Sequence, residues 1–178
     1  MRMTEKTLST EHILKGRLFD IYRLRVRLPN GRQSCREVIK HPGAVAIIPI
    51  LDDGRILLEK QYRKAVEKEL YEIPAGTLEK GEQLRTCVKR ELLEETGYAA
   101  QKIERLISFH PAPGYTSEMI HLFAARGLVL KKACPEEDET ITLAPLPYDK
   151  IIRLIRQGKI ADGKTILAML YLGLLHKA

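Results

Sequence analysis

Residues 76–98 read GTLEKGEQLRTCVKRELLEETGY, and this stretch predicts a helix with an unusual face. Apolar side chains recur at the helical spacing i, i+3 and i+4, at Leu84, Cys87 and Val88. Gly97 follows at the position where a left-handed backbone commonly ends a helix. The pattern predicts one helix over residues 83–96, packed through its apolar stripe against a core.

The same stripe continues into acidic residues. It next reaches positions 91 and 95, and both are glutamates, with Glu94 adjoining Glu95. Carboxylates one turn apart repel each other, oppose the helix dipole near a C-terminus and lose hydration against a core. A bound divalent cation would remove these costs, because magnesium and manganese take carboxylate oxygens. A solvated acidic helix end explains the periodicity equally well.

The spacing of the whole stretch resembles the Nudix box. From Gly76, five residues lead to Glu82 and seven more to the run Arg90-Glu91-Leu92-Leu93-Glu94-Glu95-Thr96-Gly97-Tyr98, which departs from the box pattern nowhere. The resemblance implies an α/β fold, the Nudix α/β/α sandwich with a mixed sheet, whose box forms a loop-helix-loop metal site. It also implies hydrolysis of a nucleoside diphosphate compound.

The resemblance assigns roles to the box residues. Glu91 and Glu95 are the first metal ligands, and Glu94, Glu82 and the backbone carbonyl of Ala75 complete the expected set. The expected ion is Mg²⁺, with Mn²⁺ as the alternative. Arg90 is expected to pair with the box glutamates and fix their orientation.

Flanking segments resemble the ADP-ribose pyrophosphatase branch. They include LYEIPAG at 70–76 and the marker proline of the branch, Pro113. In this branch an acidic loop supplies the general base, which makes Glu139 the first choice here and Glu137 the second. Expected substrate contacts come from Arg36 and Arg63, whose planar donors suit phosphate, and from Pro113 and Glu118.

Several functions stay open. ADP-ribose hydrolysis to AMP and ribose 5-phosphate is the leading prediction. GDP-mannose or a dinucleoside polyphosphate would keep the chemistry and change the substrate. A capped-RNA pyrophosphohydrolase or an RNA-binding module is disfavoured, because basic and aromatic residues do not interleave.

The rest of the chain predicts strands around the box and helices at the end. Residues 18–40 predict a hairpin through Pro29-Asn30-Gly31, and residues 43–61 a second hairpin through Asp52-Asp53-Gly54, its first strand buried on both faces. Further strands are expected at 69–73, 102–109, 118–128 and 140–144. Helices are expected at 148–157 and 164–176.

The first hairpin falls where the branch carries an N-terminal β-extension that is often exchanged within a homodimer. We therefore expect residues 1–40 to form an N-terminal β-hairpin extension that contributes to dimerisation and substrate contacts. Residues 41–178 are expected to form the Nudix domain.

Net charge, cysteine spacing and the length of apolar runs bear on the ligands and the cellular compartment of the protein. Net charge is +7, which suits an anionic small substrate as well as nucleic acid. The three cysteines, Cys35, Cys87 and Cys134, have no CxxC spacing, which favours a reducing compartment over a zinc site. No apolar run is long enough to span a bilayer. A cytoplasmic protein without a membrane partner is expected.

Overall fold

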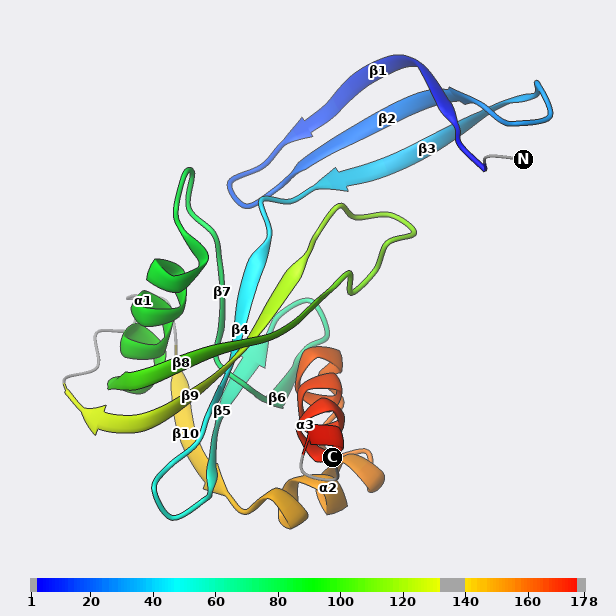
Figure 1. The fold of residues 1–178 in the computed structure, drawn as a ribbon. Helices are drawn as coiled ribbons and strands as arrows, with labels where there is room; N and C mark the ends of the chain where they lie inside the picture. The colour runs from blue at the N-terminus through cyan, green and yellow to red at the C-terminus, as the bar shows by residue number, and fades with distance from the viewer. Residues whose placement is uncertain (1–2, 132–139, 176–178) are drawn as a thin grey trace. The chain divides into compact units, whose positions relative to one another are not determined.

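A computed structural model describes residues 3–131 and 140–175. They form two compact units, and the elements of each are shown in Figure 1. The first unit comprises Met1–Gly43 and Phe109–Met119, and the second Ala44–Ser108 and Ile120–Ala178.

The first unit is built on a three-stranded antiparallel sheet. Its strands are β1 (Lys6–Lys15), β2 (Asp20–Arg27) and β3 (Gln33–Lys40), in that order. The predicted hairpin over 18–40 is confirmed as β2 and β3, and Gly31 takes a left-handed backbone (φ 85°) in their turn. Strand β1 was not predicted. All ten of its residues are exposed, so it lacks the apolar face that reveals a strand in a sequence.

The second unit contains a mixed four-stranded sheet, as expected. Its order is β7 (Ala75–Thr77), β4 (Ala44–Pro49), β9 (Ile120–Leu130) and β8 (Tyr98–Phe109). Strand β4 runs antiparallel to β7 and parallel to β9. Every residue of β4 is buried, which confirms the prediction of a strand covered on both faces.

A second sheet of this unit corrects one prediction. It consists of β10 (Ile141–Leu146), β5 (Ile56–Arg63) and β6 (Lys68–Glu72), so β4 and β5 belong to different sheets. The expected hairpin over 43–61 is therefore wrong, although its turn forms and a single bridge joins Ile50 to Ile56. The reason is that β7 and β9 occupy both hydrogen-bonding edges of β4.

Helices cover the sheets of the second unit from both sides (Figure 1). They are α1 (Leu84–Thr96), α2 (Tyr148–Arg156) and α3 (Gly163–Leu175), each within about a residue of its predicted bounds. Helix α1 packs on the four-stranded sheet, and the start of α3 is hydrogen-bonded to the end of β6. This arrangement is the α/β/α sandwich that the sequence predicted.

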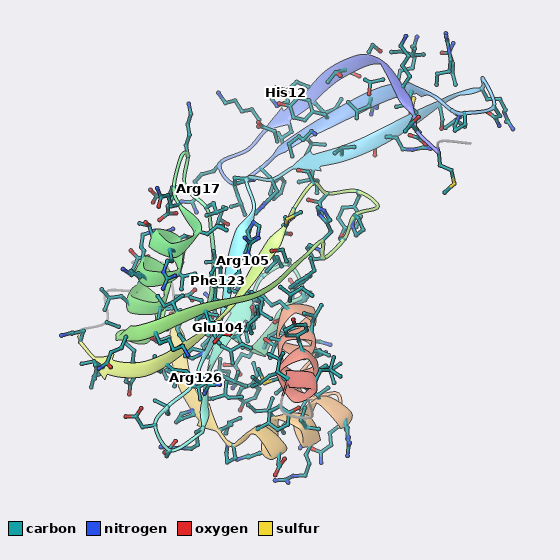
Figure 2. The ribbon with its side chains drawn as sticks, in the orientation of Figure 1. His12, Arg17, Glu104, Arg105, Phe123 and Arg126 are labelled. Carbon is teal, nitrogen blue, oxygen red and sulfur yellow. The ribbon has the colours of Figure 1, made fainter. Side chains whose placement is uncertain are left out.

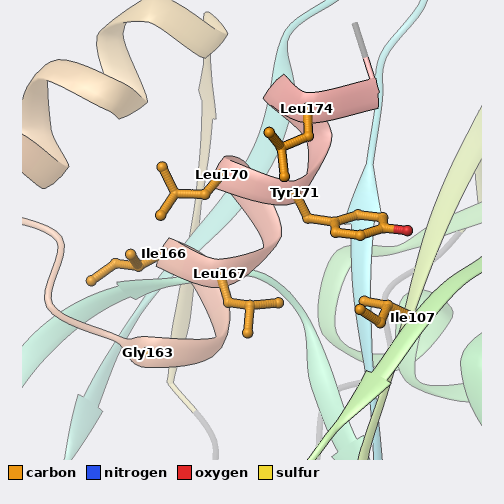
Figure 3. A pocket seen from close by; sticks show the side chains of 7 residues that line it. All are labelled: Ile107, Gly163, Ile166, Leu167, Leu170, Tyr171 and Leu174. Carbon is orange, nitrogen blue, oxygen red and sulfur yellow. The ribbon is translucent and has the colours of Figure 1, made fainter. Parts of the chain in front are cut away.

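Helix α3 is apolar on more than one side. Ala168, Met169 and Leu172 are buried, whereas Leu170 and Leu174 are 56% and 65% exposed. The exposed side lines an open apolar pocket with Ile107 of β8 (Figure 3). Within residues 3–131 and 140–175, no helix combines the length and apolar character needed to cross a membrane.

Basic side chains occur on several elements rather than along one of them. Arg17, Arg105 and Arg126, labelled in Figure 2, are all exposed and lie on the β1–β2 connection, β8 and β9. This distribution accounts for part of the positive charge as ordinary solvated surface.

Candidate active site

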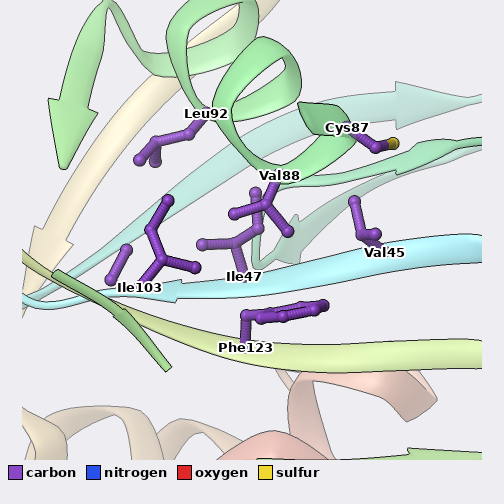
Figure 4. Close-up of a cluster of buried hydrophobic side chains, with 8 residues drawn as sticks. Val45, Ile47, Cys87, Val88, Leu92, Ile103 and Phe123 are labelled. Carbon is purple, nitrogen blue, oxygen red and sulfur yellow. The ribbon is translucent and has the colours of Figure 1, made fainter. Parts of the chain in front are cut away.

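Helix α1 buries the face that the sequence predicted. Its apolar residues pack with β4, β8 and β9 in the cluster of Figure 4, which holds Val45, Ile47, Cys87, Val88, Leu92, Ile103, Phe123 and Ala125. Glu91 and Glu95 lie on the same side and are only 9% and 7% exposed. The helix ends as expected at Gly97, whose backbone is left-handed (φ 74°) and whose N–H donates to the Leu93 carbonyl at 2.9 Å. Two carboxylates are thus held between the helix and the sheet.

Strand β7 provides the surface on which these carboxylates rest. The backbone N–H of Ala75 donates a hydrogen bond to Glu95 Oε2 at 3.0 Å. The Glu91 carboxylate lies against the α-carbon of Gly76, so closely that a β-carbon there would overlap it. Gly76 is therefore required by the close approach of a side chain, and its φ is not positive.

Arg90 joins three of the glutamates. Its Nε and Nη2 donate to the two oxygens of Glu82 at 3.1 and 3.0 Å. Its Nη1 lies 2.7 Å from Glu91 Oε1 and donates to Glu94 at 3.1 Å. The bonds from Arg90 lower the pKa of the Glu82 carboxyl to about 2, and hydrogen bonding to Glu82, followed by the charge of Glu91, raises the pKa of Arg90. Glu82 is therefore held ionised, and Arg90 fixes the orientation of all three carboxylates.

The donor set suits a divalent cation. Arg90 contacts three carboxylates, those of Glu82, Glu91 and Glu94, and its single positive charge does not balance them. Hard oxygen donors with excess negative charge are what magnesium and manganese bind. Among the described residues, no group of three or more histidine, cysteine or acidic side chains is gathered as it would be around an ion. Three of the box carboxylates are ion-paired with Arg90.

Arg63 lies at the end of β5 and is paired with a glutamate that the sequence analysis missed. Its Nε and Nη2 donate to the two oxygens of Glu72 at 2.8 and 3.0 Å, and Glu72 is 2% exposed. Glu59, directly opposite Glu72 on β5, is fully buried. Bonding to Glu72 raises the pKa of Arg63, and the charges of Glu59 and Glu95 add to the effect.

Glu59 belongs to a pattern that the sequence shows, whereas Glu72 does not. Glu59, Gln61 and Arg63 alternate along one face of a strand, and two of them are buried. Side chains at every second position of a strand point to the same face, so polar residues there place several polar groups together on one face of the sheet.

The other predicted contacts lie in the first unit. Arg36 on β3 pairs with Glu5 at 2.5 Å and donates to Ser34 Oγ at 3.0 Å. Pro113 and Glu118 belong to the segment Phe109–Met119, where the Glu118 carbonyl contacts His110 Nδ1 at 2.7 Å. The predicted bases, Glu137 and Glu139, lie outside the described residues.

An α/β/α sandwich whose box helix holds oriented carboxylates against a glycine-bearing strand defines a class of metal-dependent hydrolase domains. The chain belongs to the Nudix family, whose domain model (NUDIX domain) matches residues 40–168. Nudix hydrolases generally use divalent metal ions. Residues 5–39 match a second model, the nucleoside diphosphate sugar hydrolase N-terminal domain.

Curated relatives span nearly the whole chain. The chain is 47% identical over 172 residues to a methanol dehydrogenase activator from Bacillus methanolicus, covering 96% of this chain and 93% of the relative. It is 41% identical over 174 residues to an ADP-ribose pyrophosphatase from Bacillus subtilis, covering 97% and 94%. A GDP-mannose pyrophosphatase from Yersinia enterocolitica is 34% identical over 149 residues, with 78% of each chain covered.

A solved structure confirms the fold. The crystal structure of an ADP compounds hydrolase superimposes with a TM-score of 0.88 and covers 99% of this chain and 97% of its own, at 22% identity. The match covers residues of both units, so each unit has the architecture of that structure.

The close approach at Gly76 yields a test of whether the box glutamates bind a metal ion. Gly76→Ala places a methyl group where the Glu91 carboxylate lies, so that carboxylate must move. We expect Mn²⁺ binding, measured by calorimetry, to weaken about tenfold or more. Gly163→Ala is the matched control, because a β-carbon there meets nothing within 4 Å. Unchanged Mn²⁺ affinity in Gly76→Ala would show that Glu91 does not bind the ion.

Proposed function

We propose that this chain hydrolyses the pyrophosphate bond of ADP-ribose to give AMP and ribose 5-phosphate, with Mg²⁺ as the ion. The observation that carries the proposal is the pair of buried glutamates, Glu91 and Glu95, fitted to the backbone of β7. The name of the Bacillus subtilis relative supports the choice of substrate. A cytoplasmic location remains part of the proposal.

Glu91 and Glu95 would hold the metal, with the Ala75 carbonyl, Glu94 and Glu82 as further ligands directly or through water. When bound, divalent ions neutralise the pyrophosphate and lower the pKa of the attacking water. Arg90 keeps Glu82 ionised and orients Glu82, Glu91 and Glu94. Mn²⁺ is the alternative, since it takes the same oxygen ligands.

The proposed reaction is a displacement at phosphorus. Water attacks one phosphorus, the bridging P–O bond breaks, and the leaving phosphate keeps the bridging oxygen. A carboxylate base takes the proton of the water. We propose Glu139 for this role, then Glu137. The support is indirect: β10 begins at Ile141, soon after the acidic stretch, and Ile141 pairs with Gln61 on the strand that ends at Arg63.

Arg63 and Arg36 would bind the phosphates. Glu72 uses two of the five N–H donors of Arg63, whose side chain is 39% exposed, so donors remain for an anion. Arg36 is 40% exposed and also has donors beyond its bonds to Glu5 and Ser34. Pro113 and Glu118 are proposed to contact the terminal ribose.

A substrate panel tests the proposal. With Mg²⁺, we expect hydrolysis of ADP-ribose ahead of GDP-mannose, diadenosine polyphosphates, NADH and capped RNA, with AMP and ribose 5-phosphate identified by chromatography. Glu95→Gln should lower the rate at least about 100-fold, because it removes a ligand charge. Glu104→Gln is the matched control, since Glu104 is an exposed glutamate of β8 (Figure 2).

The panel also separates the alternatives. Preference for GDP-mannose, which the Yersinia relative is named for, would keep the chemistry and replace the substrate. Inactivity of the wild-type protein on every compound would refute hydrolysis of this substrate class.

A second candidate function is activation of a dehydrogenase. The Bacillus methanolicus relative, named a methanol dehydrogenase activator, covers nearly the same residues as the pyrophosphatase relative. If the chain shares that role through the proposed site, it should raise the rate of a methanol dehydrogenase, and Glu95→Gln should lose the effect. The rate of methanol oxidation by the dehydrogenase measures the effect. Equal activation by Glu95→Gln would point to a role independent of the site.

We further propose that residues 1–40 form a dimerisation extension on a Nudix domain of residues 41–178. The family match over 5–39 supports the boundary. Strand β1 supports the role in dimerisation, because it is an exposed edge strand and such an edge can pair with another chain. The partner would be a second copy of this chain.

Deleting residues 1–40 tests this organisation. The deletion removes the whole of the β1–β3 sheet, and we expect a monomer by light scattering with activity reduced to background. The full-length protein, measured at the same concentration, is the control and should be a dimer. An active monomeric truncation would separate the extension from both roles.

A further inference from the structure

Lys164 lies where a cation is unfavourable. It is the second residue of α3, and the N-terminus of a helix carries partial positive charge. Its side chain is nevertheless only 13% exposed. Asp162 just before the helix offsets part of this cost, since its Oδ1 lies 3.2 Å from Lys164 Nζ and its Oδ2 accepts the Thr165 N–H at 2.9 Å. A buried lysine at this position calls for a further partner.

That partner is Glu72. Lys164 Nζ donates to Glu72 Oε2, the oxygen that also accepts from Arg63 Nη2. One buried carboxylate is thus shared between a lysine of α3 and an arginine of β5. Arg63 is therefore not the only cation on Glu72, because Lys164 contacts the same carboxylate.

A second bond attaches α3 beside the same point. The backbone N–H of Ile73 donates to Thr165 Oγ1 at 2.8 Å, and this hydroxyl donates to Asp162 Oδ2 at 2.6 Å. Thr165 therefore provides a neutral attachment, whereas Lys164 provides a charged one. The two can be removed separately.

We propose that Lys164 is a positioning residue, which holds Glu72 so that Arg63 presents its remaining donors to the substrate diphosphate. The inference rests on the proposed function, in which Arg63 binds phosphate. Without Lys164, Arg63 alone must neutralise a carboxylate that is 2% exposed. Its guanidinium is then drawn onto Glu72, and its attraction for an anion falls.

A kinetic double-mutant cycle tests the coupling. We expect Lys164→Met to raise KM for ADP-ribose about tenfold and to change kcat less than about twofold, because ground-state binding is lost. Lys164→Arg should restore most of the affinity. Arg63→Ala with Lys164→Met should have the KM of Arg63→Ala alone, since Lys164 acts through Arg63.

Two controls separate this role from a structural one. Thr165→Val removes the neutral attachment and should lower the unfolding midpoint while KM stays within about twofold of wild type. Lys159→Met removes an exposed lysine between α2 and α3 and should change neither quantity. A KM effect of Lys164→Met that multiplies with that of Arg63→Ala, or that Thr165→Val reproduces, would overturn the inference.

A second readout does not depend on activity. The ¹⁵N–¹H signal of Arg63 Nε, identified by its loss in Arg63→Lys, should move in Lys164→Met and stay in place in Lys159→Met. Wild-type protein that is inactive on the whole substrate panel would defeat the proposed function, and this signal would still test the contact. An unmoved Arg63 signal in active protein would defeat the inference alone.

Discussion

Burying acidic groups under a helix is the constraint on which the site depends. Glu91 and Glu95 lie where the amphipathic pattern of α1 would place apolar residues, and both are more than nine-tenths buried. A buried carboxylate without compensation costs several kcal/mol. The Ala75 N–H compensates Glu95 and the guanidinium of Arg90 compensates Glu91, while Gly76 leaves the space that the Glu91 carboxylate occupies. The short strand β7 must therefore run beside α1, and its pairing with β4 keeps it there.

Strand edges determine the rest of the second unit. Because β4 is paired on both edges, β5 cannot continue a hairpin with it and joins β6 and β10 instead. The second sheet then carries Arg63 and Glu72 on neighbouring strands, and α3 closes over the end of β6. Glu91 and Glu95 of α1 thus rest against the first sheet, whereas Arg63 belongs to the second, and the few residues between Glu72 and Gly76 link the two sheets.

Local pattern accounts for what the sequence could predict. Helix α1 and strand β4 each have a pattern that is complete within about a dozen residues, and both were predicted with nearly correct bounds. Gly97 was correctly predicted as the residue that ends α1. The box spacing also identified the glutamates that the structure places against β7. Their roles, like those of Arg36, Pro113 and Glu118, stay predictions.

Long-range constraints account for what was missed. The occupied edges of β4 depend on strands more than twenty residues away, so the turn at 52–54 looked like a hairpin. Strand β1 has no buried face to detect. The partners Glu72 and Lys164 are 92 residues apart, and neither has a local feature that indicates the other.

The buried thiol of Cys87 can be used to measure local opening of the protein. Its side chain is fully buried beneath α1, with Sγ 3.5 Å from Arg90 Nη2, and burial raises the pKa of its thiol to about 12. A thiol that is both covered and protonated reacts with an alkylating reagent only when the helix lifts from the sheet. Cys35 is exposed and reacts in the closed state. The rate at which such a reagent modified Cys87 would therefore report how often the box helix opens.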